Sequence, residues 1–126
     1  MDKRTAEWLK QANYDLDTAE FMANGGRHFY AVFMCHLAVE KALKGLFQAK
    51  LGATAPKTHN LAYLLEQTGL RPHQGTMEFL VRLNEAQIAA RYLQNMAATQ
   101  AAYPKALVRT ILAQAKETTA WIRQQL

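Results

Sequence analysis

A glutamate stands at a position where an amphipathic helix should present only apolar groups. At about 100° per residue, four apolar residues share one face of a helix with Glu40 among them: Phe29, Phe33, Leu43 and Phe47. His36 comes one turn before Glu40, and Lys44 comes one turn after it. A carboxylate that faces a core is costly unless it is paired and hydrogen-bonded. We therefore expect a buried polar network around Glu40.

The counter-charges of Glu40 can be sought on its own helix and on a second one. Glu40 and Lys44 have the favourable order of a carboxylate one turn before an ammonium group. Arg91 is the favoured partner from another helix, because a guanidinium can grip a carboxylate with two hydrogen bonds. A tyrosine hydroxyl is the alternative, from Tyr14, Tyr63 or Tyr92. The expected network consists of His36, Glu40, Lys44 and Arg91. For the Glu40–Lys44 pair we favour a structural role over one in which Lys44 contacts a phosphate.

Four residues are candidates for contact with an anionic ligand: Lys41, Lys44, His59 and Arg91. Lys41 lies on a different helix face from Glu40, turned toward solvent. His59 follows a Pro-Lys-Thr loop at the mouth of a helix, where an imidazole could act as an acid or base or donate to a phosphate. The alternative for His59 is a hydrogen bond that packs the loop onto the Glu40 helix. His36 is expected to be a satisfied interior histidine.

Several classes of site are missing from the sequence. His36 and Glu40 are four residues apart, but neither HExxH nor a repeated Glu-x-x-His occurs. Gly25-Gly26 is not followed by the Gly-Lys-Ser/Thr of a phosphate loop. The chain has no serine, which excludes a serine triad. We expect no metal and no cofactor, and the sequence assigns no catalytic residue.

Composition and charge indicate the kind of protein and of partner. With 126 residues the chain is long enough for one domain, 1–126. Its net charge is +5, and between Phe21 and Leu65 Glu40 is the only acidic residue. This basic middle suits an anionic partner, or is a solvated helix face. No apolar run is long enough to span a membrane, no secretory signal is visible, and the single Cys35 fits a buried thiol, so we expect a cytoplasmic protein.

Helical spacing of apolar residues runs through nearly the whole chain. It predicts helices over about 5–23, 29–51, 59–67, 76–96 and 104 to the end. Thr5 is a plausible first cap, Asn24-Gly25-Gly26 a stop, and Thr58 or Asn60 the cap of the short third helix. Residues 95–102 could extend the fourth helix or form a mobile link. We expect a break before Tyr103-Pro104. The expected fold is all-α, an antiparallel up-and-down bundle of four long helices plus one short helix.

These residues form a pattern that resembles a known family. An N-terminal amphipathic helix and a glycine turn precede Phe33 and the stretch His36-Leu37-Ala38-Val39-Glu40-Lys41-Ala42-Leu43-Lys44. A loop then ends in Pro56-Lys57-Thr58-His59-Asn60-Leu61, Ala90-Arg91-Tyr92 follows, and a helix closes the chain. Over nearly its whole length the chain resembles the HEPN domain (higher eukaryotes and prokaryotes nucleotide-binding). The most specific parts are AVEKALK and THNL at their relative spacing.

The resemblance implies a helical bundle that is commonly dimeric and often works beside a minimal nucleotidyltransferase. Many members are ribonucleases or toxins of toxin–antitoxin pairs, and others are nucleotide-binding or helper domains. The ribonucleases carry an arginine followed four to six residues later by a histidine. Arg91 is followed by no histidine at that distance, nor is any other arginine. This departure argues against a ribonuclease.

We therefore predict a small, dimeric, non-catalytic HEPN-type module. It would bind a nucleotide or another anionic ligand, or partner a minimal nucleotidyltransferase. The alternatives are a divergent ribonuclease or toxin, in which His59, Arg91 and Lys44 act on RNA, and a pure protein-interaction module. A homodimer is expected because a small bundle cannot hide all the apolar residues that lie off the core stripes, among them Trp8, Tyr14, Phe21, Tyr30 and Met34.

Overall fold

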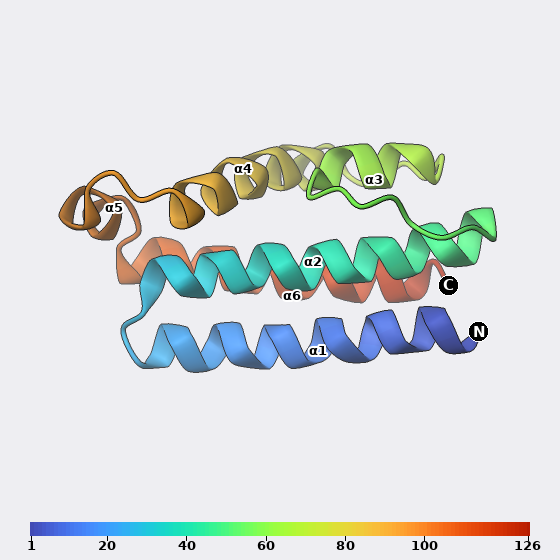
Figure 1. Cartoon of the computed structure of the whole chain (residues 1–126), viewed down its shortest axis with the longest axis horizontal. Helices are drawn as coiled ribbons and strands as arrows, with labels where there is room; N and C mark the ends of the chain where they lie inside the picture. The colour runs from blue at the N-terminus through green and yellow to red at the C-terminus, as the bar shows by residue number, and fades with distance from the viewer.

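The computed structural model describes residues 1–126 and contains helices but no strands. There are six helices: α1 (Lys3–Asn24), α2 (His28–Leu51), α3 (Leu61–Gln67), α4 (Gln74–Arg91), α5 (Met96–Ala102) and α6 (Lys105–Gln124). The four long helices run alternately up and down the bundle, and α2 lies between α1 and the α3–α4 pair, with α6 behind it (Figure 1). Helix α2 contacts every other helix, so its different faces meet different neighbours. The predicted all-α antiparallel bundle is confirmed.

Helix α1 packs on α2 through a row of residues spaced three and four apart. The row is buried and most of its members are small: Thr5, Leu9, Ala12, Leu16, Ala19 and Ala23. The side chain of Asp2 caps the helix by accepting from the backbone N–H of Thr5. The expectation that Thr5 is the cap is wrong by three residues. Thr5 is fully buried instead, because it faces Gly45 of α2.

Helix α2 begins within one residue of the predicted start and ends as predicted. Gly52 follows its last turn with a φ of 63°, a left-handed conformation that suits glycine and stops the helix. Residues 52–60 then run back along α2 as an extended connection (Figure 1). Asn60 caps α3 by accepting from the N–H of Tyr63, so α3 begins at Leu61 and His59 lies in the connection before it.

Residues 95–102, for which the sequence allowed a helix or a link, contain a short helix. Helix α4 ends at Arg91, and residues 96–102 form the separate short helix α5, capped by the side chain of Asn95. The predicted break before Tyr103-Pro104 is present, since α5 ends at Ala102 and α6 begins at Lys105. The bundle thus has two short helices, α3 and α5, instead of the single one expected.

The core is a continuous set of apolar side chains contributed by all four long helices and α3. Cys35 lies within it and is fully buried. Burial raises the pKa of the Cys35 thiol to about 12. None of the helices is both long enough and apolar enough to cross a membrane.

Candidate functional site

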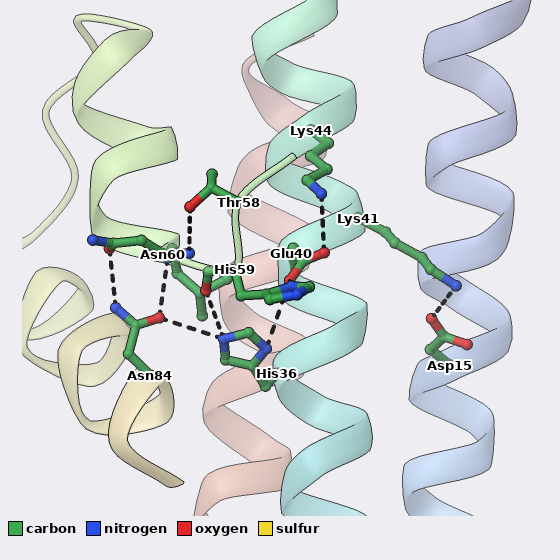
Figure 2. Close-up of polar contacts among 10 residues, drawn as sticks. Asp15, His36, Glu40, Lys41, Lys44, Thr58, His59, Asn60 and Asn84 are labelled. Carbon is green, nitrogen blue, oxygen red and sulfur yellow. Dashed lines mark hydrogen bonds and ion pairs between the residues drawn. The ribbon is translucent and has the colours of Figure 1, made fainter. Parts of the chain in front are cut away.

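Glu40 lies in the middle of α2 with its side chain only 6% exposed. Two donors reach its carboxylate from different parts of the chain (Figure 2). The ammonium group of Lys44 donates to Oε2 over 3.1 Å, and Nδ1 of His59 donates to Oε1 over 2.7 Å. The buried carboxylate is therefore paired and hydrogen-bonded, which offsets the cost of removing it from water.

Lys44 is the counter-charge on the same helix, one turn after Glu40. Its side chain is 10% exposed, and its Nζ lies 5.8 Å from the centre of the Trp8 ring of α1. A cation over an indole face gains electrostatic stabilisation from the ring. Lys44 is thus held between Glu40 and Trp8, and its charge is already satisfied within the molecule.

His59 joins the cluster from the connection before α3, nineteen residues after Glu40. A carboxylate can only accept, so the short contact places the imidazole proton on Nδ1. The side chain is 56% exposed, and its Nε2 makes no hydrogen bond within the protein. His59 therefore presents a free Nε2 on the outside of the cluster, while its other nitrogen is fixed by a buried carboxylate.

His36 closes the cluster on the side of α4. Its Nε2 lies 2.9 Å from the backbone oxygen of His59 and 3.4 Å from Oδ1 of Asn84. Both are acceptors, so Nε2 carries the proton and Nδ1 faces Glu40 at 3.9 Å. Burial holds the pKa of His36 below its ordinary value, against the opposing attraction of Glu40. The ring is a neutral donor that binds the backbone of the 52–60 connection to α2.

Asn84 of α4 fixes the same connection from the other side. Its Oδ1 accepts from the backbone N–H of Leu61 over 3.0 Å, and its Nδ2 donates to Oδ1 of Asn60 over 3.1 Å. The oxygen of Asn60 also accepts from the N–H of Tyr63. Both amides, which face each other in Figure 2, therefore have a defined orientation. The segment from His59 to Leu61 is held at three points, by Glu40, His36 and Asn84.

Lys41 does not join the cluster. Its Nζ lies 2.8 Å from the carboxylate of Asp15 on α1, whose side chain is 8% exposed (Figure 2). The lysine side chain is 20% exposed, less than expected for a solvent-facing phosphate contact. Its charge is used to neutralise a buried carboxylate at the contact of α1 with α2.

Arg91 does not pair with Glu40, contrary to the expectation from the sequence. Helix α4 runs antiparallel to α2, so Asn84 lies level with His36, and Arg91 lies about 10 Å farther along α4 at 1.5 Å per residue. That displacement leads away from Glu40. The guanidinium carbon of Arg91 instead lies 5.5 Å from the centre of the Phe33 ring. The tyrosines offered as alternatives are all exposed and make no side-chain bond to Glu40.

A shallow surface groove adjoins Arg91 at the junction of α1, α2 and α4. Its volume is about 480 Å³ and its lining is mainly apolar: Met22, Tyr30, Phe33, Met34, Ala90 and Arg91. Arg91 is exposed and takes part in none of the ion pairs of the molecule. The groove therefore combines aromatic and aliphatic walls with one uncompensated positive charge.

Two residues of this region were not singled out from the sequence. Asn84 interrupts the apolar pattern of α4 beside the buried Leu83, and this interruption was a usable signal. Asp15 similarly stands beside Leu16 on the inner side of α1 and is buried. In both cases a polar residue at a core-facing position indicates a partner on another helix.

The comparisons with known proteins agree with the fold. A model of the HEPN domain family matches residues 5–125. The crystal structure of TT1696 from Thermus thermophilus is similar at 26% sequence identity and a TM-score of 0.84, covering 99% of this chain and 100% of that chain. ST0689, an archaeal HEPN homologue, is similar at 24% identity and a TM-score of 0.78, with 98% of each chain covered. No curated protein matches the sequence.

Proposed function

This chain belongs to the HEPN domain family, and from that membership we propose that it is a non-catalytic, dimeric module that binds a nucleotide or a similar anionic ligand. The proposed binding position is the groove beside Arg91. The buried cluster around Glu40 has a structural role in this proposal. Four features support it: charge compensation in the cluster, the groove itself, the exposed apolar surface and the basic charge of the chain.

Charge compensation argues against ligand binding at the cluster. Lys44 has Glu40 as its partner, and Lys41 has Asp15. A phosphate that approached either lysine would have to displace a buried carboxylate, and the desolvated carboxylate would then lose its counter-charge. Two of the four candidate ligand contacts are therefore already occupied by groups of the protein.

The single observation that carries the proposal is the unpaired Arg91 beside an apolar groove. A nucleotide offers a planar base and a negatively charged phosphate. The groove offers the Tyr30 ring among its walls and the guanidinium of Arg91, which lies over Phe33 and has no ion-pair partner. Arg side chains bind phosphate through two hydrogen bonds in the plane of the guanidinium. The net charge of +5 further favours an anionic partner.

The dimer rests on exposed apolar surface. Large apolar side chains remain outside the core, with Phe21 and Tyr14 of α1 at 77% and 74% exposure and Tyr92 after α4 at 70%. Tyr14 and Phe21 are seven residues apart and so share one face of α1, and apolar side chains gathered on one face of a small protein are typical of an interface. Light scattering coupled to gel filtration tests this directly: a mass of one chain at micromolar concentration would contradict the dimer.

Thermal-shift measurements with ATP, GTP, AMP and pyrophosphate at millimolar concentration test ligand binding. A ligand that binds only the folded state raises the melting temperature with its concentration. Arg91→Leu should abolish the shift, and Arg71→Leu, at an exposed arginine in the connection before α4, should leave it unchanged. Absence of stabilisation by every nucleotide would contradict the proposal.

The same preparation separates this proposal from the alternatives. RNA incubated with the purified protein should stay intact, whereas a divergent ribonuclease would degrade it. A minimal nucleotidyltransferase encoded in the neighbouring reading frame would identify the partner of a two-component, toxin–antitoxin-like pair. Co-expression of both chains, followed by purification through a tag on one, would test that partnership.

A further inference from the structure

His59 differs from the other three histidines in how its two ring nitrogens are used. Nδ1 of His59 donates to a carboxylate that is almost fully buried, and Nε2 has no partner within the protein. His36 has its Nε2 bonded to backbone and amide oxygens and is buried. The side chains of His28 and His73 make no hydrogen bond with the protein. Only His59 combines a fixed tautomer with an accessible basic nitrogen.

From this arrangement we propose that Nε2 of His59 is an acceptor for a phosphoryl group from an activated donor, an acyl phosphate or a phosphoramidate. The proposal is independent of the groove beside Arg91. It assigns a covalent modification site to the connection between α2 and α3.

The chemistry follows from the tautomer. With its proton on Nδ1, the ring has its lone pair on Nε2, and that lone pair attacks phosphorus. The bond from phosphorus to the leaving group breaks, and the electron pair departs with a carboxylate from an acyl phosphate or with ammonia from a phosphoramidate. The Nδ1 proton remains in place, so the phosphorylated ring carries a positive charge. Glu40 lies 2.7 Å from Nδ1 and stabilises that charge, as a buried carboxylate stabilises an imidazolium in a catalytic triad.

The surroundings of His59 favour a nucleophile over an acid or base that acts on a bound substrate. His59 is absent from the linings of five surface cavities of the molecule, so none of these five holds a small molecule against Nε2. The side chain is instead more than half exposed on a connection that another molecule can approach. Lys57 lies two residues earlier and is exposed, which adds positive charge beside a phosphoryl group.

The positioning of the ring is also unusually well defined for an exposed side chain. The backbone oxygen of His59 accepts from His36, and the next two residues are bonded to Asn84. The imidazole therefore keeps its contact with Glu40 (Figure 2), while more than half of the side chain is exposed. A reactive nitrogen that is oriented in advance loses little freedom on reaction.

The test is reaction of the whole purified protein with potassium phosphoramidate at neutral pH. Modification of each histidine is followed by mass spectrometry of peptides kept at alkaline pH, and ³¹P NMR assigns the phosphorylated nitrogen. We expect His59 to be modified at Nε2 at least ten times faster than His28 and His73 in the same molecules. Equal rates at the three histidines, or modification of His59 at Nδ1, would overturn the proposal.

Two variants test the role of the carboxylate. Glu40→Gln should slow modification of His59 about tenfold, and Glu20→Gln, at a half-exposed glutamate paired with Lys116, should leave the rate unchanged. Circular dichroism shows whether Glu40→Gln is folded at the temperature of the reaction. An unchanged rate in folded Glu40→Gln would overturn the proposal. If that variant is unfolded, the comparison of His59 with His28 and His73 in the protein without substitutions decides alone.

Discussion

The side-chain amide of Asn84 donates to Oδ1 of Asn60 over 3.1 Å, and that oxygen also accepts from the N–H of Tyr63 in the first turn of α3. Oδ1 of Asn84 in turn accepts from the N–H of Leu61. One side chain of α4 thus satisfies the start of α3 and places the preceding connection on α2. The connection has no helix or strand of its own, so its position depends on these contacts.

Asn84→Ala should loosen the connection without disturbing the rest of the bundle. The substitution removes the acceptor of a partly buried hydrogen bond from Leu61, worth about 1 kcal/mol, and the donor of an exposed one to Asn60. Local opening then becomes more frequent. We expect trypsin to cut after the exposed Lys57 about ten times faster under native conditions.

Asn95→Ala is the matched control, because Asn95 also caps a helix with its side chain but lies before α5. Cleavage after Lys57 should keep its original rate in that variant. Equal acceleration in both variants would mean that cleavage reports global stability, and the proposed role of Asn84 would then be wrong.

The buried ion pair of Glu40 and Lys44 should couple strongly in a double-mutant cycle. Glu40→Gln leaves Lys44 buried without a counter-charge, and we expect it to lower the free energy of unfolding by about 3 kcal/mol. Lys44→Met should cost less, about 1 kcal/mol, because Glu40 keeps its bond to His59. The double variant should be more stable than Glu40→Gln alone, as measured by urea unfolding. Simple additivity of the two costs would contradict the pairing.

The course of the long helices could be predicted because apolar spacing and stop signals agree. Gly52 at the end of α2 and the break before Pro104 are local signals, and the structure has both. The first residue of α1 was harder to predict, since both Asp2 and Thr5 are good capping residues. Only the packing of α1 against Gly45 decides that Thr5 is buried and Asp2 is the cap. The alanine-rich segment that forms α5 carries no apolar periodicity, so the only local signal for a helix there is the capping residue Asn95.

The partner of Glu40 could not be identified from spacing along the chain. Which helix residues lie level with Glu40 depends on the direction and offset of α4, and seven residues separate Asn84 from Arg91. The sequence favoured the guanidinium of Arg91 on chemical grounds, but the structure brings His59 to Glu40 and places Asn84, not Arg91, level with His36. A hydrogen bond that packs the His59 loop onto α2 was one of the two interpretations of this residue, and the structure has such a bond, from His59 to Glu40.

Gly45 is required by the close approach of α1 to α2. A Cβ added there would lie 3.2 Å from Cβ of Trp8 and 3.5 Å from the backbone oxygen of Thr5. Neither atom can move without its helix, so Gly45→Ala should lower the free energy of unfolding by about 1 kcal/mol through overpacking. This loss comes in spite of the better helix propensity of alanine.

Gly75 in the first turn of α4 provides the control for Gly45, since an added Cβ there meets no atom within 4 Å. Gly75→Ala should raise the free energy of unfolding, by up to about 1 kcal/mol. Opposite signs in urea unfolding are expected for the two substitutions. A stabilising Gly45→Ala would show that α1 can shift at little cost.

Cys35 should be inert in the folded protein. It is fully buried, and its pKa of about 12 leaves almost no thiolate at neutral pH. We expect no reaction with 5,5′-dithiobis(2-nitrobenzoic acid) over an hour at pH 8, and full reaction within minutes in 8 M urea. Rapid labelling of the native protein would mean that the core around α2 opens frequently.

The stability of the fold should fall as the solution is acidified below about pH 6.5, in part through His36. Its ordinary pKa is 6.5, and burial lowers that pKa in the folded state against the attraction of Glu40. Below pH 6.5 His36 of the unfolded chain therefore binds a proton, whereas His36 of the folded protein stays neutral until a lower pH. The free energy of unfolding decreases with falling pH over this interval, down to the pKa of His36 in the folded state. One proton contributes at most about 1.4 kcal/mol per pH unit.

His36→Gln should reduce this dependence between pH 7.5 and 5.5, whereas His73→Gln, at an exposed histidine, should leave it unchanged. The other groups that act on His36 are the carboxylate of Glu40, the backbone oxygen and the imidazole of His59, and the amide of Asn84. Of these Glu40 and His59 can carry a charge, and both are present in both variants, so the difference between the variants reports the loss of His36. An NMR titration of the ring in the unmodified protein gives a second measurement, and a His36 pKa at or above 6.5 would contradict the prediction even if His36→Gln fails to fold.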